Sequence, residues 1–220
     1  MEQMRIRKEI AMKDREIRTY LGPVECRASE DDDSKITLVG KPIVFNQKTD
    51  IGGMWEETID PGAINEKTLR DVMLLVNHDF DGIPLARSRR NNKNSTMRLT
   101  IGKDAVEMEA DLDARNPKAI ELDSAVKRGD IDGMSFAFLV DKDKWENLDS
   151  DYPKRTILSV SQVFEVSAVN WPAYSQTDIS SRSLESGKKS LAEAREALER
   201  AKARAEKIAE LNEQLKEIQS

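Results

Sequence analysis

Alternating apolar and polar residues predict β-strands over much of the first 170 residues. In several segments a hydrophobic side chain recurs at every second position, which is the spacing of one face of a strand. Turn-forming residues separate these segments, as at 102–104, where a hairpin is predicted, and residues 141–154 predict a polar loop. The predicted strands cover residues 16–28, 36–45, 72–77, 97–101, 106–112, 134–140 and 156–169.

Capping signals predict helices at two places among the strands. Asp60 can cap a short helix that has Pro61 at its first position. Asn116, followed by Pro117, begins a second helix, which carries basic residues in its last turn and ends before Gly129. Strands therefore outnumber helices, and the sequence predicts an α+β fold that is mainly β, with antiparallel strands in a barrel-like or sandwich-like arrangement.

The last part of the chain has a different pattern. Residues 175–189 are rich in Ser, Thr and Gly, which predicts a flexible linker. Apolar residues then recur at threes and fours from 191 to 218 in a charged background, which predicts an amphipathic helix with coiled-coil character. Its narrow, alanine-rich stripe favours a partner helix and hence self-association. The predicted organisation is an N-terminal arm (1–15), a folded domain (16–174), the linker and a helix over 190–220.

Composition excludes several classes of function. The net charge of -6 argues against a nucleic-acid binder that works through bulk electrostatics. A single cysteine, Cys26, excludes an intramolecular disulfide, and a single histidine, His78, argues against a zinc site. We expect no metal and no cofactor. No stretch is apolar enough to span a membrane, so a soluble protein of a reducing compartment is expected.

Three polar residues stand out against apolar surroundings. Ser135 follows a turn and lies in an apolar strand, on the face with the smaller side chains. A serine needs a base to become a nucleophile, and His78, at the end of an apolar run, is the candidate. Glu165 interrupts an apolar strand, where a charge is costly unless it is paired. Asp79 competes with Glu165 as the group that orients the histidine, and each of these residues taken alone also fits a structural role.

The order of these motifs resembles a known family. Asn77-His78-Asp79 is followed by GMSFAF at 133–138 and by EVSAV at 165–169, with Pro172-Ala173 beyond. This set, spread over roughly residues 17–175, resembles the prohead (capsid maturation) proteases of tailed phages. The resemblance implies a serine endopeptidase with a β-barrel of the herpesvirus-assemblin type surrounded by helices. It also implies action inside the assembling procapsid in the host cytoplasm, on scaffold segments of the major capsid protein and on the protease itself.

The resemblance assigns a role to each of the three polar residues. It implies that Ser135 is the nucleophile, His78 the general base and Glu165 the group that orients His78. Two positions depart from the family pattern, because Ala137 and Ala86 stand where glycine is common. A non-enzymatic scaffold or assembly protein is the alternative interpretation. Hydrolysis of sugars by a carboxylate pair is poorly supported, because the acidic residues lie mostly on predicted solvated faces.

Overall fold

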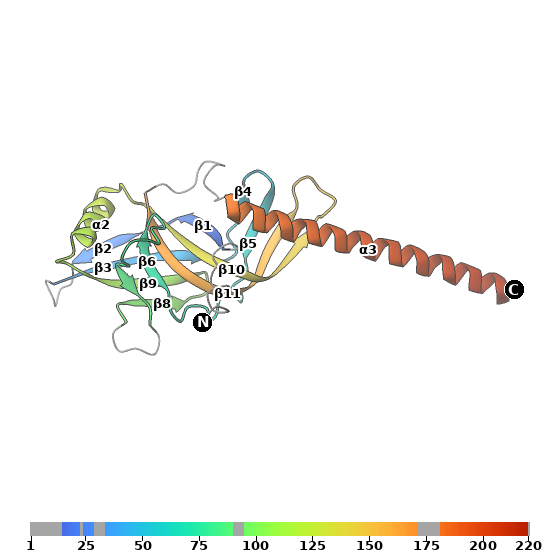
Figure 1. The fold of residues 1–220 in the computed structure, drawn as a ribbon, viewed down its shortest axis with the longest axis horizontal. Helices are drawn as coiled ribbons and strands as arrows, with labels where there is room; N and C mark the ends of the chain where they lie inside the picture. The colour runs from blue at the N-terminus through green and yellow to red at the C-terminus, as the bar shows by residue number, and fades with distance from the viewer. Residues whose placement is uncertain (1–14, 23, 29–33, 90–94, 171–180, 220) are drawn as a thin grey trace.

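The computed structural model describes residues 15–22, 24–28, 34–89, 95–170 and 181–219. Within these residues the chain forms two β-sheets and two α-helices, so the fold is α+β and mainly β, as predicted. The last helix extends from the β structure as a single rod (Figure 1). The predicted N-terminal arm lies almost wholly outside the described residues.

The larger sheet has seven strands, and it includes both the first and the last strand of the β domain in sequence. Its main path runs β1-β10-β11-β5-β4, with β6 paired to β11 and β7 paired to β6. The strands of this sheet are β1 (Glu16–Leu21), β4 (Thr49–Ile51), β5 (Trp55–Ile59), β6 (Met73–Val76), β7 (Ala86–Arg87), β10 (Gly133–Glu146) and β11 (Lys154–Val169).

The smaller sheet has four strands in the order β2-β3-β9-β8, and all its pairings are antiparallel. Its strands are β2 (Glu25–Ala28), β3 (Lys35–Val44), β8 (Met97–Ile101) and β9 (Ala105–Asp113). The strand predicted over 16–28 is therefore wrong as one element: it divides into β1 and β2, which belong to different sheets.

β10 and β11 form the long antiparallel pair on which the larger sheet is built. They pair from Gly133 with Val169 to Glu146 with Lys154. The polar loop predicted over 141–154 is consequently too long, because both strands continue into it and their outer ends carry exposed charged side chains. On its other side β11 pairs in parallel with β5 near its start and with β6 near its end.

The hydrophobic core lies between the two sheets. Residues of β3 and β9 in the smaller sheet that belong to this core, such as Leu38 and Val106, are fully buried. They belong to one cluster with Phe136 of β10 and Val166 of β11. Fully burying such side chains contributes about 1.5–3 kcal/mol each. The opposite face of β10 and β11 lies outside this cluster, and it carries the polar residues discussed below.

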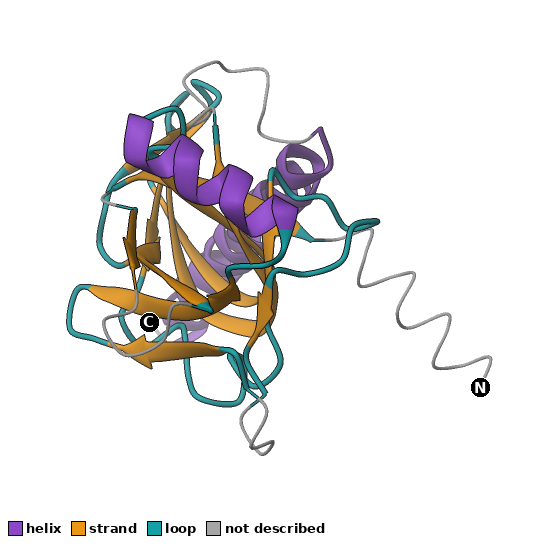
Figure 2. Ribbon diagram, turned by 90° about the vertical axis from the view of Figure 1, so that its left-hand side faces the viewer, coloured by secondary structure: helices purple, strands orange, loops and turns teal. Residues whose placement is uncertain are grey.

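The helix that begins at Pro117 confirms the capping prediction. It is α2 (Pro117–Arg128), capped by Asn116, whose Oδ1 accepts from the backbone N–H of Lys118 at 3.1 Å. Gly129 ends it in the left-handed conformation, with φ 78°. Figure 2 shows α2 lying across one end of the β structure, where it contacts β2 and β3.

The short helix predicted after Asp60 is wrong. Residues 60–71 form turns, and Asp60 Oδ1 accepts from the backbone N–H of Gly62 at 2.7 Å. Its carboxylate thus caps a turn, since Gly62 and the residues after it do not continue as a helix. The barrel is not found either: among the described residues the strands form two separate sheets, and neither sheet closes on itself.

The C-terminal helix α3 (Ser181–Gln219) begins earlier than predicted. The linker prediction is wrong for residues 181–189, which are helical; its remaining residues lie outside the described part of the chain. Gly187 is buried, and a Cβ there would lie 2.5 Å from the Trp55 ring. Ser186 hydrogen-bonds to the buried Glu16 and Ser190 to the partly buried Asp143, both in the β domain. The small residues of this segment therefore permit close packing, although their composition suggests flexibility.

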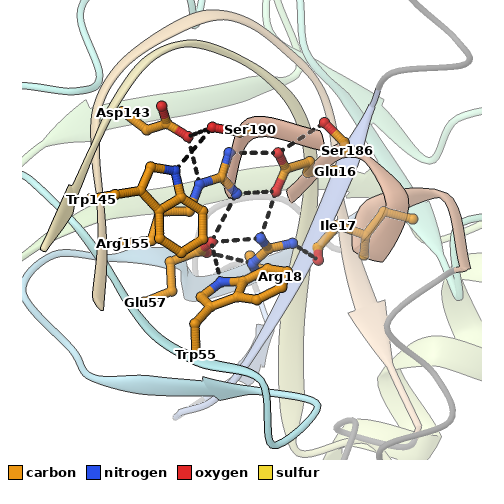
Figure 3. A network of polar contacts seen from close by, with 10 residues as sticks. All are labelled: Glu16, Ile17, Arg18, Trp55, Glu57, Asp143, Trp145, Arg155, Ser186 and Ser190. Atoms are coloured by element: carbon orange, nitrogen blue, oxygen red, sulfur yellow. Dashed lines mark hydrogen bonds and ion pairs between the residues drawn. The ribbon is translucent and has the colours of Figure 1, made fainter. Parts of the chain in front are cut away.

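A network of buried charges lies where α3 meets the β domain (Figure 3). Arg18 binds both Glu57, at 2.5 Å, and Glu16, at 2.5 Å. Arg155 binds Glu16 at 2.8 Å, Glu57 at 3.0 Å and Asp143 at 2.7 Å. Both arginines, Glu16 and Glu57 are at most 2% exposed, so their charges depend on one another for stabilisation.

The same network joins the helix to the strands. Ser186 Oγ donates to Glu16 Oε1 at 3.2 Å, and Ser190 Oγ donates to Asp143 Oδ2 at 2.7 Å. Trp145 Nε1 donates to Ser190 Oγ at 3.0 Å. The first turns of α3 are therefore part of the folded domain. Arg195 and Lys202 still contact residues 148–150, and the helix beyond them extends away from the domain.

Candidate active site

Ser135 lies in β10, on the face that points away from the core between the sheets. It pairs with Thr19 of β1 on one side and with Ser167 of β11 on the other. Its side chain is fully buried. Ser135 Oγ donates to the carbonyl oxygen of Arg18 at 2.9 Å and accepts from Thr19 Oγ1 at 2.9 Å. The hydroxyl proton is thus directed toward β1 in this structure.

His78 follows β6 in a turn with an unusual backbone. Asn77 and His78 have φ angles of 51° and 57°, in the left-handed region that side chains other than glycine seldom adopt. This pair of residues ends the strand and turns the imidazole toward β11. His78 Nδ1 lies 2.8 Å from Glu165 Oε1, and the histidine side chain is 20% exposed. A carboxylate can only accept, so Nδ1 carries the proton and Nε2 is left to accept another.

Glu165 is brought to His78 by the parallel pairing of β6 with β11. In this register Glu165 pairs with Met73 and Ser167 with Leu75, so the end of β6 points to the part of β11 just beyond Glu165. Glu165 is fully buried. Its second oxygen, Oε2, accepts from Ser167 Oγ at 2.5 Å. Both oxygens of this buried carboxylate therefore have a donor, which offsets the cost of its burial.

Asp79, the alternative partner of His78, has other contacts. Its Oδ1 accepts from the backbone N–H of Gly82 at 3.0 Å, and its Oδ2 lies 3.9 Å from Lys118 Nζ. The carboxylate is half-exposed and closes the turn that follows His78. Of the two acidic candidates, Glu165 is the one in contact with the imidazole.

Ser135 and Glu165 lie on the neighbouring strands β10 and β11 and His78 lies in the turn after β6, but the structure joins only two of these residues directly. His78 and Glu165 are hydrogen-bonded, whereas the hydrogen bonds of Ser135 to described residues go to β1. Such bonds are often long or missing before substrate binds, so this arrangement is compatible with a catalytic serine. Two hydroxyl groups that the sequence did not single out, those of Thr19 and Ser167, complete the polar cluster.

The alanines that depart from the family pattern fit their positions. Ala137 lies in β10, opposite Glu165, and Ala86 lies in β7, opposite Leu74. Neither has a positive φ, so neither backbone requires the freedom of glycine. Both side chains are buried, which places a methyl group where glycine would leave space.

Other chemistry finds little support in the described residues. Burial, together with the nearby Asp123, raises the pKa of the Cys26 thiol to about 12, so this thiol is not a competing nucleophile at neutral pH. The described part of the chain holds no group of three or more His, Cys, Asp or Glu side chains that could bind a metal. Nor do its helices include one that is long and apolar enough to cross a membrane.

Comparison with known proteins gives one match. A family model described as caudovirus prohead serine protease matches residues 23–190, a span that contains His78, Ser135 and Glu165. No curated protein and no solved structure matches the chain. The match ends within the first turns of α3, the part of the helix that packs on the β domain. Because it covers most of the sequence, the chain belongs to the caudovirus prohead serine protease family.

Proposed function

We propose that this protein is the serine endopeptidase of capsid maturation in which Ser135 is the nucleophile, His78 the general base and Glu165 the residue that orients His78. Its substrates are the scaffold segments of the major capsid protein and its own chain, within the assembling procapsid. The observation that carries the proposal is the partly buried hydrogen bond between His78 and Glu165, where Glu165 lies on β11, the strand next to that of Ser135. Family membership supports the class of reaction.

The proposed reaction follows from the protonation of the imidazole. Glu165 holds the proton on Nδ1, so Nε2 can accept the proton of Ser135 Oγ as this oxygen bonds to the carbonyl carbon of the substrate. His78 then gives that proton to the nitrogen of the leaving peptide, and the C–N bond breaks. In the second half of the reaction Nε2 of His78 takes a proton from water as the water oxygen bonds to the acyl carbon, and it returns this proton to Ser135 Oγ as the ester bond breaks. For the first step the hydroxyl must turn from Arg18 O toward His78, and the groups that bury it must move to admit substrate.

Co-expression with the capsid protein tests this function. The wild-type protein should shorten the capsid protein and itself, as measured by intact mass, while the Ser135→Ala protein should leave both at full length. Ser161→Ala is the matched control, because Ser161 lies on β11 and is exposed. Capsid protein that is shortened equally in the presence of Ser135→Ala would overturn the proposal.

Replacement of Glu165 by glutamine should slow cleavage and change its pH dependence. The amide has no charge to stabilise the imidazolium, so the acidic limb of the rate profile should move to lower pH, with a rate loss of up to about 10⁴-fold. The measurement is the initial rate of capsid-protein cleavage across the acidic and neutral range. Asp79→Asn is the matched control and should leave the profile in place. A Glu165→Gln profile identical to that of the wild type would contradict the role of Glu165.

Two C-terminal truncations should separate catalysis from recruitment. Removal of residues 203–220 spares every described contact between α3 and the β domain, the last being Lys202 with Asp149. We expect this form to cleave at the wild-type rate but to enter procapsids poorly, because the removed helix carries exposed Ile208 and Leu211. Removal of 184–220 also deletes Ser186, Gly187 and Ser190, and it should lower stability as well.

The readouts are cleavage rate, thermal unfolding and the amount of protease recovered in purified procapsids. Normal packaging of the protein without 203–220 would refute the recruitment role of the helix. Equal stability of the two truncated forms would contradict the assignment of the first turns of α3 to the folded domain.

A further inference from the structure

Ser167 contacts both members of the hydrogen-bonded pair in the candidate site. Its side chain is fully buried on β11, two residues after Glu165. The hydroxyl donates to Glu165 Oε2 at 2.5 Å and accepts from the backbone N–H of His78 at 3.2 Å. One small side chain thus connects the carboxylate with the main chain of the histidine.

The bond to Glu165 fixes the carboxylate group. Oε1 accepts from His78 and Oε2 from Ser167, so donors on two different oxygens set the rotation of the carboxylate. Without Ser167, Oε2 would be a buried acceptor with no donor among the described residues, and the group would gain by turning toward another donor. That turn would remove Oε1 from Nδ1 of the imidazole.

The bond to His78 holds a strained backbone in place. Asn77 and His78 are both left-handed, a conformation that persists only where the surroundings enforce it. Asn77 is held by its N–H to Ala168 O at 3.0 Å and by its Oδ1, which accepts from the N–H of Asn170 at 3.2 Å. The backbone N–H of His78 itself is held by Ser167.

We infer that Ser167 is a positioning residue of this protease, which keeps Glu165 and His78 in the mutual geometry that leaves Nε2 free for the proton of Ser135. The inference rests on the proposed function. The nucleophile proposed above is Ser135, whereas Ser167 contacts the other two residues of the candidate site, Glu165 and His78. Its effect on the rate is therefore exerted through Glu165 and His78.

A double-mutant cycle tests the inference, with kcat and KM measured for cleavage of purified capsid protein. Ser167→Ala should lower kcat on the order of 10- to 100-fold with little change in KM, since a small misplacement of a catalytic group has an effect of this size. In the Glu165→Gln background the same change should cost little more, because the pair it positions is already broken. Ser167→Thr retains the hydroxyl and should keep kcat close to that of the wild type.

Three outcomes would overturn the inference. An unchanged kcat in Ser167→Ala would show that the hydroxyl is dispensable, and a loss that multiplies with that of Glu165→Gln would indicate an independent structural effect. An equal loss in Ser167→Thr and Ser167→Ala would show that the hydroxyl is not the feature that matters. A further measurement distinguishes failure of this inference from failure of the proposed function: each variant is treated with a serine-reactive phosphonate, and the labelled residue is identified. Label that remains on Ser135 supports the proposed nucleophile even where the role of Ser167 fails.

Discussion

Replacement of Ser135 by alanine is expected to lower proteolysis by about 10⁶-fold, the loss typical of removing the nucleophile of a serine protease. Alanine retains the Cβ and fits the buried strand, so the fold should persist. The lost hydroxyl removes the bonds to Arg18 O and Thr19 Oγ1, which should cost about 1 kcal/mol of unfolding free energy each. The measurements are cleavage of purified capsid protein and thermal unfolding of the same preparation.

A folded Ser135→Ala protein that cleaves within tenfold of the wild-type rate would remove Ser135 from the mechanism. Ser167 would then be the residue to examine, because it contacts both His78 and Glu165. A variant that has lost activity together with its cooperative unfolding would instead contradict the expectation that this side chain is dispensable for folding.

Replacement of Arg155 by methionine should destabilise the protein by about 3–5 kcal/mol, because it leaves the buried carboxylates of Glu16 and Glu57 with one arginine between them. Methionine has a similar length and no charge, so the change removes ion pairs more than it removes volume. Arg27→Met is the matched control. Arg27 and Glu25 form an ion pair that is 65% and 56% exposed, and its loss should cost less than about 1 kcal/mol.

The same network predicts a loss of stability in acid. Burial alone would raise the pKa of Glu57, but Arg18 and Arg155 outweigh it and lower that pKa below its usual value. The stabilisation from Glu57 is therefore present above the ordinary pKa of a glutamate and is lost as the pH falls through the lowered value. Chemical unfolding at neutral and acidic pH measures both effects. Equal stabilities of Arg155→Met and Arg27→Met at neutral pH would contradict the importance of the network.

Local patterns predicted the elements whose stabilisation is itself local. The alternation in 97–112 and 134–140 corresponds to strands, and the helix after Asn116 has the cap and the terminal glycine that its sequence indicates. The capping signal of Asp60 predicts a helix, but turns share this signal, and residues 60–71 form turns. The sequence does not indicate the start of α3, because small residues are typical both of close packing and of flexible linkers. The Trp55 ring leaves no room for a Cβ at position 187, but Trp55 lies far from Gly187 in the sequence.

Contacts between distant segments could be predicted only in part. A charged Glu165 in an apolar strand and a single histidine indicated a pair, but the 2.8 Å contact depends on the parallel register of β6 and β11. Ser167 gave no signal, since a serine in a strand is common and its partners are determined by the same register. The Arg155 network, with the serines of α3 that bind to it, joins residues separated by up to 170 positions, which no local pattern records.

The most direct measurement of the central claim is to find which side chain a serine-reactive phosphonate modifies in the native protein. Peptide mass mapping should place the label on Ser135 in the wild type and find none in Ser135→Ala. The Ser161→Ala control should be labelled like the wild type. His78→Ala should be labelled far more slowly, because Ser135 Oγ then has no base to take its proton. Label on Ser167, or label that survives in Ser135→Ala, would contradict the account.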